Sequence, residues 1–452
     1  MVIKNSYHIL SLGCAKNTVD SESMSLIMAR AGYRRLDEPD QAQFIIVNTC
    51  GFIRPAQDES LHLLQQLAEG KRKNQYLIAA GCLSERLKEG LLSQNSGIDG
   101  VFGTRRWMDI LRVIQKIRSL SAGEGPYVYF PNQLIDEDQT GDVPRVAIQG
   151  ASAYLKIADG CRHRCAFCAI PVIKGPQQSR PIEKIVEDAL LLQEQGVQEI
   201  NLIAQDSTGY GLDLGMTDGL SLLLEKLLPV VPDVPWIRIL YAFPGSVSPR
   251  LIDLMAESKQ ILPYIDIPLQ HADPDILRAM HRPVNMDWVY STLQVLRNRI
   301  PGIALRSTFI VGYPGETEEK FQVLLDFLRE VQLDHVGAFT YSFEPGTPGE
   351  SLGDPIPENV KAERLERLML QQEQISEARN QQMVGKTLPV LIEGIGDGIS
   401  VGRSYRDAPE IDGLVFIDQS LNEGEIVPVK VTRAMVHDLL ASVETPKRKS
   451  SK

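Results

Sequence analysis

Six cysteines form two sets of three, and one set has a spacing that could bind an iron-sulfur cluster. Cys161, Cys165 and Cys168 follow the pattern C-x-x-x-C-x-x-C within one short stretch. Three thiolates on one loop can bind three corners of a cubane cluster. The fourth iron then stays open for another ligand, as the open position of a catalytic zinc ion does. This set therefore predicts a cluster that binds a small molecule.

The second set is Cys14, Cys50 and Cys82, which are far apart in sequence but alike in context. Each follows or ends an apolar run typical of a buried strand, over residues 7–13, 44–49 and 76–81. In an open parallel sheet, ligand sites lie just past the carboxyl ends of the strands. We therefore expect these three cysteines to converge on one point.

Three other roles for the cysteines fit the sequence less well. Disulfides are disfavoured, because residues 1–11 lack the regions of a signal peptide and the composition fits a reduced cytosolic chain. A structural zinc site usually has four protein ligands, and no fourth cysteine or paired histidine follows the short loop. Any single cysteine of the second set is most simply explained as a buried, unreactive residue. That explanation is weaker for three cysteines that each follow a predicted strand.

Composition limits the class of protein. The chain has 452 residues and 43% hydrophobic residues, enough for two or three cores. No apolar run approaches the length of a membrane span. The net charge of −11 argues against a broad basic surface for nucleic acid and suits a basic partner. We expect a cytoplasmic protein without a membrane segment.

Periodicity predicts an α/β organisation with three folded parts. From residue 7 to about 120, apolar strands alternate with helical patterns, which is typical of a doubly wound parallel sheet. Beyond residue 145 the alternation resumes with six further strands and predicts a TIM-like parallel (β/α) barrel, where chemistry collects at the carboxyl ends. The six strands are expected at 153–157, 199–203, 236–241, 264–267, 304–311 and 337–341.

Local signals define the remaining parts. Ser248, Asp273 and Thr317 precede proline or acidic residues, as residues that cap helix starts do. A long polar helix is expected over 357–383, followed by short apolar runs typical of a small antiparallel β-barrel. The predicted domains are a cluster domain at 5–120, a linker at 121–144, a catalytic core at 145–383, a small barrel at 385–446 and a basic tail at 447–452.

These residues together resemble a known enzyme family. The cysteine loop, with Phe167 directly before Cys168, is similar to the signature of the radical S-adenosylmethionine (SAM) superfamily. The last segment resembles the TRAM domain. The likeness to the methylthiotransferases of that superfamily rests on SLGCAKN (11–17), NTCGFI (48–53) and AGCL (80–83).

The resemblance extends to one branch of the methylthiotransferases. The sequences LGCAKN (12–17), IAQD (203–206), DIPLQH (266–271) and SYRDAPEIDG (404–413) are similar to the ribosomal-protein branch, the RimO type. This likeness implies transfer of a methylthio group to the β carbon of an aspartate in small-subunit ribosomal protein number twelve. The alternatives are a transfer RNA adenosine methylthiotransferase and a non-enzymatic iron-sulfur electron carrier, which would hold each cluster with four cysteines.

The family likeness also implies cofactors and partners. Two 4Fe-4S clusters would be bound, one by each cysteine set, and SAM would bind the open iron of the cluster at Cys161. An unactivated carbon needs a radical that side chains cannot supply, so a cofactor must provide it. The implied partners are a basic ribosomal protein, free or in the assembled subunit, and an electron donor such as flavodoxin or ferredoxin. Transfer RNA is not expected as a direct substrate.

Five further residues are candidates for binding the cofactor. Phe167 is expected beside the adenine, with ordinary packing as the alternative. Gln205 and Asp206 end one predicted strand, and Arg306 and Thr308 lie on another. For these four, a structural role at a turn or strand end is the alternative. His271 is expected to be a satisfied polar residue rather than a ligand.

The sequence departs from the family pattern at Gln178. An arginine is expected there, while Lys174 and Arg180 keep their charges. We therefore expect the group that this arginine contacts in the family, either the cofactor or the substrate backbone, to be bound more weakly in this chain.

Charge supplies a separate argument for the branch. Residues 385–446 contain ten acids and five bases, a net charge of −5. A barrel that grips RNA phosphates should be basic, whereas an acidic barrel suits a basic protein. The alternative is that these acids only make the protein surface more soluble. The acids expected to face the partner are Asp407, Glu410, Asp412, Glu423 and Glu425.

Overall fold

The computed structural model describes residues 2–121, 124–131 and 143–443. The chain divides into two compact units, each built from several segments. The first unit comprises residues 1–147, 154–180 and 342–351, and the second comprises 148–153, 181–341 and 352–452. Both cysteine sets therefore lie in the first unit. None of the described helices combines the length and apolarity needed to cross a membrane.

The N-terminal part of the first unit is a parallel sheet of six strands in the order β2-β1-β3-β4-β5-β6. All of its strand pairs are parallel, as predicted. Its elements are β1 (Ile3–Ser11), α1 (Ala15–Arg30), β2 (Arg34–Arg35), β3 (Ala42–Thr49), α2 (Arg54–Glu69), β4 (Tyr76–Gly81), α3 (Cys82–Leu87), α4 (Gly90–Gln94), β5 (Gly100–Phe102), α5 (Ile110–Ser119) and β6 (Tyr127–Tyr129).

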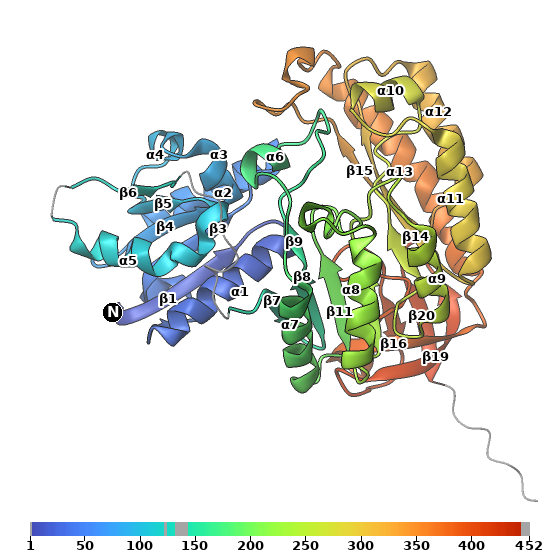
Figure 1. Cartoon of the computed structure of the whole chain (residues 1–452), viewed down its shortest axis with the longest axis horizontal. Helices are drawn as coiled ribbons and strands as arrows, with labels where there is room; N and C mark the ends of the chain where they lie inside the picture. Colours follow the sequence, from blue (N-terminus) through green and yellow to red (C-terminus); the bar gives the residue numbers. More distant parts are fainter. Residues whose placement is uncertain (1, 122–123, 132–142, 444–452) are drawn as a thin grey trace, which may run out of the picture. The chain divides into compact units, whose positions relative to one another are not determined.

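Helices cover both faces of this sheet (Figure 1). On one face, Met24 and Met28 of α1 and Val113 of α5 pack against strand residues such as Ile46. On the other face, Leu64 of α2 packs against a separate apolar cluster. Strand side chains alternate between the two faces, so a strand buried on both sides is apolar throughout. The doubly wound prediction is confirmed.

The segment expected to be a linker, 121–144, contributes a strand to this sheet. β6 pairs in parallel with β5, and Val101 lies opposite Val128. The sequence Tyr127-Val128-Tyr129 favours strand over loop, because aromatic and β-branched residues fit a pleated surface. The acidic cluster Asp136, Glu137 and Asp138 and the basic tail at 447–452 lie outside the described residues.

The first unit continues into the segment that carries Cys161, Cys165 and Cys168. Two short strands there pair in antiparallel fashion, with Gln178 opposite Asp159. The elements that follow the N-terminal sheet along the chain are β7 (Val146–Gln149), β8 (Ser152–Lys156), β9 (Ala158–Asp159), α6 (Ile170–Ile173) and β10 (Gln178–Ser179). β7 and β8 form one sheet with β11 and β12, and residues 148–153 belong to the second unit.

The second unit contains the parallel strands of a partial (β/α) barrel. β11 pairs with β12, an isolated bridge joins Ile237 to Ile261, and β13, β14 and β15 pair in that order. The predicted alternation is confirmed, and β11 and β14 have the predicted bounds. The elements are α7 (Ile182–Glu194), β11 (Glu199–Ile203), α8 (Gly219–Leu227), β12 (Trp236–Ile239), α9 (Pro249–Glu257), β13 (Tyr264–Asp266), α10 (Pro274–Ala279), α11 (Met286–Arg299), β14 (Ala304–Val311), α12 (Glu318–Val331) and β15 (His335–Thr340).

The three predicted caps start helices of this barrel. The Ser248 side chain accepts a hydrogen bond from the amide of Leu251 at the start of α9. Asp273 caps α10 in the same way, and Thr317 caps α12. Such bonds satisfy amides that have no partner inside the helix.

A long helix and a closed five-stranded barrel complete the second unit. The helix, α13 (Glu358–Gln381), was predicted from its polar sequence. The barrel has the order β16-β17-β18-β20-β19, and only β18 and β20 pair in parallel. Its core includes Val390, Val415 and Val429. The strands are β16 (Thr387–Gly396), β17 (Ile399–Ser404), β18 (Val415–Ile417), β19 (Ile426–Ala434) and β20 (Leu439–Val443).

Candidate iron-sulfur and cofactor site

The structure places Cys14, Cys50 and Cys82 at one edge of the N-terminal sheet. Cys14 directly precedes α1, Cys50 directly follows β3, and Cys82 begins α3 directly after β4. β1, β3 and β4 are adjacent and parallel, so their carboxyl ends lie side by side. β1 ends at Ser11, two residues before the predicted Gly13.

The loops after these strands pack closely because two glycines leave room. Gly13 has a φ of +87°, and a Cβ added there would lie 2.7 Å from Cys50 Sγ. Gly81 has a φ of +94°, and a Cβ there would clash with Asn48 and Thr49. Both positions favour glycine, since other residues rarely adopt positive φ. The two glycines allow the chain around the three cysteines to converge.

Asn17 joins the ends of all three strands, although it was not selected as a site residue from the sequence. Its Nδ2 donates hydrogen bonds to the carbonyls of Leu12 and Thr49, at 2.9 and 3.1 Å. Its Oδ1 accepts one from Cys82 Sγ at 3.5 Å. The side chain is 1% exposed. The available signal was its position three residues after Cys14, within a stretch that matched the family.

None of the six cysteines, all of which lie in the described part of the chain, forms a disulfide. Burial raises the pKa of Cys82 to about 12; Lys174 opposes this shift, and the Cys14 and Cys50 thiols add to it. Burial also raises the pKa of Cys50. Thiolates are the ligands that iron-sulfur clusters use, so the donor chemistry fits such a group.

Within the described residues, no three His, Cys, Asp or Glu side chains are placed to hold a single metal ion. A cubane requires a different arrangement, because each of its thiolates binds a separate iron atom.

Cys161, Cys165 and Cys168 lie on a loop between β9 and α6. The amide of Cys168 donates to the carbonyl of Cys165 at 3.1 Å, and the amide of Cys161 donates to the carbonyl of Gly175 at 3.2 Å. Cys165 is buried, while the other two thiols are partly accessible. The loop therefore folds back on the segment that follows α6.

The two cysteine sets are packed together through α6. Cys82 forms an apolar cluster with Ala169 and Ile173, which lie just after Cys168. Arg105 donates hydrogen bonds to the carbonyls of Val172 and Ile173. α6 is thus held against the residues of the N-terminal sheet domain.

Residues 342–351 are linked to the chain next to both sets. Glu344 is 2% exposed and forms an ion pair of 2.6 Å with Arg86, whose Nη1 donates to the carbonyl of Gly51 at 3.0 Å. The amide of Gly349 donates to the carbonyl of Ala166 at 2.8 Å. This short segment is therefore linked through Arg86 to the residue after Cys50 and contacts the residue after Cys165 directly.

The predicted cofactor residues at the end of β11 differ in their surroundings. Gln205 has a buried Oε1 that accepts no hydrogen bond from the described residues. Such an atom is costly unless a ligand or water donates to it. Asp206 Oδ1 instead accepts from Thr208 Oγ1 at 2.6 Å and from the amide of Gly209 at 3.0 Å. Asp206 closes a turn, which was the structural alternative.

Arg306 has protein partners that were not expected. It is the third residue of β14, far from the carboxyl end at Val311, and it forms ion pairs with Asp266 at 3.1 Å and Asp412 at 3.2 Å. Burial opposes its positive charge, but Asp266 and its neighbours raise the pKa of Arg306 overall. Its Nη1 also donates to Thr308 Oγ1 at 3.4 Å. We therefore omit Arg306 from the proposed cofactor site.

Phe167 is half-buried beside Cys168. His271 is fully buried, and its Nδ1 accepts from the amide of Asp273 at 2.9 Å. Its buried Nε2 makes no hydrogen bond with the described residues and lies 3.5 Å from Glu316 Oε2, so the expectation of a satisfied polar residue holds for only one of the two ring nitrogens.

Two acids expected to face a partner are buried. The side chain of Asp412 is 2% exposed and accepts a hydrogen bond from Tyr264 at 2.7 Å as well as pairing with Arg306. Asp407 is 6% exposed and accepts from Ser404 at 2.7 Å. The expectation was wrong for these two residues, because sequence charge does not reveal an internal counter-ion. Glu410, Glu423 and Glu425 are exposed.

Comparison with known proteins identifies the family. The model of the radical SAM superfamily matches residues 155–328, that of the uncharacterized protein family UPF0004 matches 6–103, and that of the TRAM domain matches 384–443. The "Ribosomal protein uS12 methylthiotransferase RimO" of Roseiflexus sp. (strain RS-1) is 44% identical over 97% of this chain and 98% of its own. That of Chloroflexus aurantiacus is 45% identical over 96% and 98%. This chain belongs to the RimO family. It is a radical SAM methylthiotransferase.

A solved radical SAM enzyme has a fold similar to that of this RimO family member. The radical SAM methyltransferase TsrM from Kitasatospora setae matches with a TM-score of 0.55 over 76% of this chain and 75% of its own. Sequence identity is 15%, so this likeness concerns the fold alone.

This RimO chain lacks the expected arginine at one position. That position lies near charged side chains of the first unit. Gln178 is opposite Asp159 in the β9–β10 pair. Asp159 pairs instead with Lys156, at 2.6 Å. The carboxylate opposite the missing arginine is thus neutralised by a lysine.

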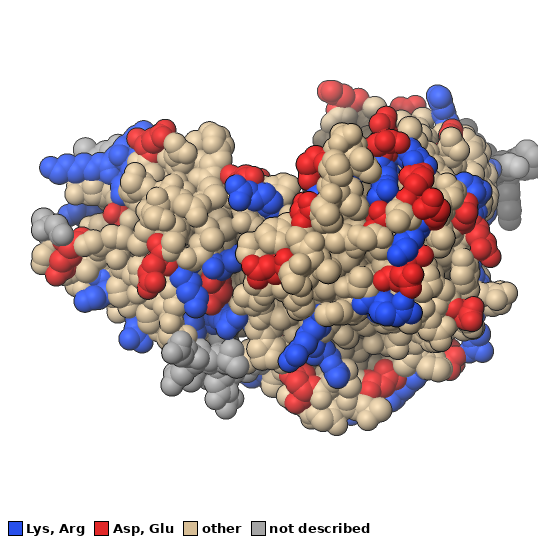
Figure 2. Space-filling view, turned by 90° about the horizontal axis from the view of Figure 1, so that it is seen from above, with Lys and Arg blue, Asp and Glu red and all other residues tan. Residues whose placement is uncertain are grey.

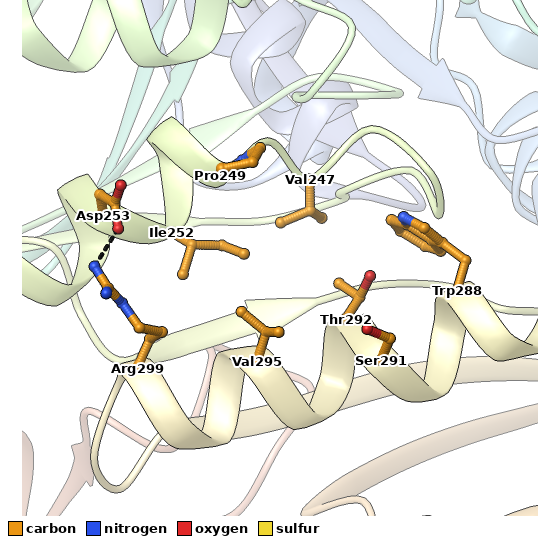
Figure 3. A pocket seen from close by; sticks show the side chains of 9 residues that line it. All are labelled: Val247, Pro249, Ile252, Asp253, Trp288, Ser291, Thr292, Val295 and Arg299. Atoms are coloured by element: carbon orange, nitrogen blue, oxygen red, sulfur yellow. Dashed lines mark hydrogen bonds and ion pairs between the residues drawn. The ribbon is translucent and has the colours of Figure 1, made fainter.

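A separate pocket lies between α9 and α11 of the second unit (Figure 3). It has a volume of about 370 Å³, and Val247, Ile252 and Val295 line it together with Trp288. The ion pair between Asp253 and Arg299 lies at one end. No predicted site residue lines this pocket, which is a surface feature of the barrel helices.

Proposed function

We propose that this protein adds a methylthio group to the β carbon of an aspartate in ribosomal protein uS12. The observation that carries the proposal is 44% identity over nearly the full length of a relative with that named activity. The exposed acids of the C-terminal barrel support a basic protein substrate. On the face seen in Figure 2, Lys and Arg side chains are interspersed with Asp and Glu, which does not favour the transfer RNA alternative.

We propose that two 4Fe-4S clusters are bound, one by each cysteine set. Cys161, Cys165 and Cys168 would hold the cluster that binds SAM, and Cys14, Cys50 and Cys82 would hold the second. When bound, these groups would supply the radical that removes a hydrogen atom and the sulfur that replaces it, and a second SAM molecule would supply the methyl group. The electron donor would be a small redox protein such as flavodoxin or ferredoxin, in the cytoplasm.

The chain's own residues would position these groups. Asn17 holds the loops after three strands in place. Ser60 Oγ accepts a hydrogen bond from the amide of Cys50 at 3.0 Å and donates one to the carbonyl of Cys50 at 2.8 Å. We propose that Phe167 packs beside the adenine of SAM. The buried Oε1 of Gln205 would accept a hydrogen bond from that cofactor, whereas Asp206 and Thr308 would act by shaping the nearby backbone and barrel wall.

The two roles can be separated by removing one cysteine set at a time. Cys161→Ala, Cys165→Ala and Cys168→Ala in one chain should leave roughly half the iron, because one of two clusters remains, and should abolish production of 5′-deoxyadenosine. Cys14→Ala, Cys50→Ala and Cys82→Ala together should spare that production but stop methylthio transfer, measured by mass spectrometry of uS12. Continued 5′-deoxyadenosine formation by the first variant would refute the assignment of the radical cluster.

The substrate needs its own measurement. Mass spectrometry of uS12 and of transfer RNA, from cells with and without this chain, should show loss of the methylthio group from uS12 alone. A loss from transfer RNA with unchanged uS12 would instead establish the alternative substrate.

A further inference from the structure

Five ionisable side chains meet in the interior of the first unit, and the proposed function uses none of them. Asp20 of α1 is 1% exposed and forms ion pairs with Arg145, with Lys156 at 2.7 Å and with Lys174 at 2.9 Å. Asp159 pairs with Lys156 at 2.6 Å and with Lys174 at 3.5 Å. We call these five residues the charge network.

The charge network contains more positive than negative charge. Three cations, Arg145, Lys156 and Lys174, face two carboxylates, so the five side chains carry one net positive charge. Burial opposes the charge on Lys174, but Asp159, Asp20 and Cys82 raise its pKa overall. Burial lowers the pKa of Lys156. Beyond these two carboxylates, the positive charge of Lys174 also acts on Glu85 and Cys82 of α3, and a buried cation needs such anions near it.

Lys174 lies between the two cysteine sets. It follows Ile173, which packs against Cys82, and its positive charge opposes the rise in pKa that burial causes at Cys82. The next residue, Gly175, accepts the hydrogen bond from the amide of Cys161. Residues 173–175 therefore link the buried Cys82 side chain of one set to the backbone amide of Cys161 in the other.

The positive charge of Lys174 beside Cys82 matches the group that the N-terminal thiols are suited to hold. A cubane of charge 2+ bound by three thiolates has one net negative charge, and bound sulfide would make it more negative. We propose that Lys174 supplies the counter-charge of the cluster on Cys14, Cys50 and Cys82, and that Asp20 holds the ammonium group in place and limits its effect. This inference rests on the proposed ligand set.

The charge network should therefore set the reduction potential of that cluster. Reduction adds an electron, and a nearby buried cation stabilises the more negative state, as charge near a cluster does. Lys174→Met removes one positive charge, while Asp20→Asn removes one negative charge from the same ion pair. Electrostatics predicts opposite shifts for the two variants, whereas mere disruption of the ion pair predicts shifts in the same direction.

The test uses the full chain with Cys161, Cys165 and Cys168 replaced by Ala, so that only the N-terminal cluster contributes. The midpoint potential of the reconstituted cluster is followed by its absorbance and electron paramagnetic resonance during a redox titration. Lys174→Met should shift the potential to more negative values, and Asp20→Asn should shift it to more positive values. Lys174→Arg should keep it close to that of the background protein.

Lys116→Met is the matched control, because Lys116 lies in the same unit but is exposed on α5. It should cause a smaller shift than Lys174→Met. Shifts of the same sign for Lys174→Met and Asp20→Asn, or no difference from the control, would overturn the inference. If Lys174→Met takes up no iron, Asp20→Asn decides alone, and a negative or absent shift overturns it. A background protein without any cluster would instead refute the ligand set of the proposed function, and this inference with it.

Discussion

At the scale of single residues, Gly13 controls how closely the chain beside Cys14 approaches Cys50. A methyl group at position 13 would lie 2.7 Å from Cys50 Sγ. Gly32 has nearly the same backbone conformation, with a φ of +83° against +87°, but nothing lies within 4 Å of its added Cβ. Comparing alanine substitutions at these two glycines therefore distinguishes the effect of backbone strain from the effect of contact with the Cys50 thiol.

Gly13→Ala should lower the iron content of the reconstituted protein by roughly half, because only one of two clusters depends on these thiols. Gly32→Ala should keep the iron, although both variants lose about 1–2 kcal/mol to the left-handed backbone. Iron analysis and thermal unfolding measure the two effects separately. Equal iron loss in both variants would show that strain, and not contact with Cys50, is responsible.

At the scale of elements, buried charges join the C-terminal barrel to the strands of the second unit. Glu199, the first residue of β11, pairs with Arg238 of β12 at 2.8 Å and with Arg403 of β17 at 2.5 Å. Ser152 of β8 donates to the same carboxylate at 2.8 Å. Burial would raise the pKa of Glu199, but Arg238 and Arg403 lower it to about 2. Four strands thus share one carboxylate.

Glu199→Gln should destabilise the protein at pH 7 by about 3–5 kcal/mol, because it leaves buried guanidinium groups without their counter-ion. The folded pKa of about 2 lies below the ordinary value, which is about 4.3. The stabilisation is therefore complete above the ordinary value and is lost as pH falls toward the folded one.

The measurement is denaturant unfolding of the full chain at several pH values. The stability difference between wild type and Glu199→Gln should be constant from neutral pH to about pH 5 and should shrink below about pH 4. Glu393→Gln is the control, since Glu393 also pairs with Arg403 but its side chain is 31% exposed. A loss as large for Glu393→Gln as for Glu199→Gln would contradict a special role of burial.

At the scale of the whole molecule, charge should govern the encounter with a basic substrate. The chain has a net charge of −11, and Glu410, Glu423 and Glu425 are exposed on the C-terminal barrel. Asp407 and Asp412 no longer belong to this surface, because they are paired inside the protein. Exposed charges attract over about 8 Å at physiological salt and mainly affect association.

Changing Glu410, Glu423 and Glu425 to Gln in the full chain should weaken binding to uS12 and flatten its dependence on salt. The affinity is measured at two salt concentrations. Glu38, Glu69 and Glu89 are exposed in the first unit and, changed to Gln together, provide a control with the same net charge. An equal loss in both triple variants would mean that overall charge, not the barrel surface, attracts the substrate. Steeply salt-dependent binding of wild type to a transfer RNA stem-loop alone would contradict the proposed substrate.

The sequence by itself determined the elements and the cysteine sets. Apolar runs located β3, β4, β11 and β14, because burial on both faces leaves a continuous hydrophobic signal. Capping residues located the starts of α9, α10 and α12. Cysteine spacing and sequence context are local properties, so the sequence alone was enough to predict the two sets of cluster ligands.

Only the tertiary structure decided the partners of charged and polar side chains. Asp412 and Arg306, 106 residues apart, were expected on a docking surface and in a cofactor pocket, yet they neutralise each other. Asp20 was not singled out in the sequence, but in the fold it meets Lys156 and Lys174, from segments more than 130 residues away. A charge has no periodicity that reveals its counter-ion, because the pairing depends on contacts between distant segments.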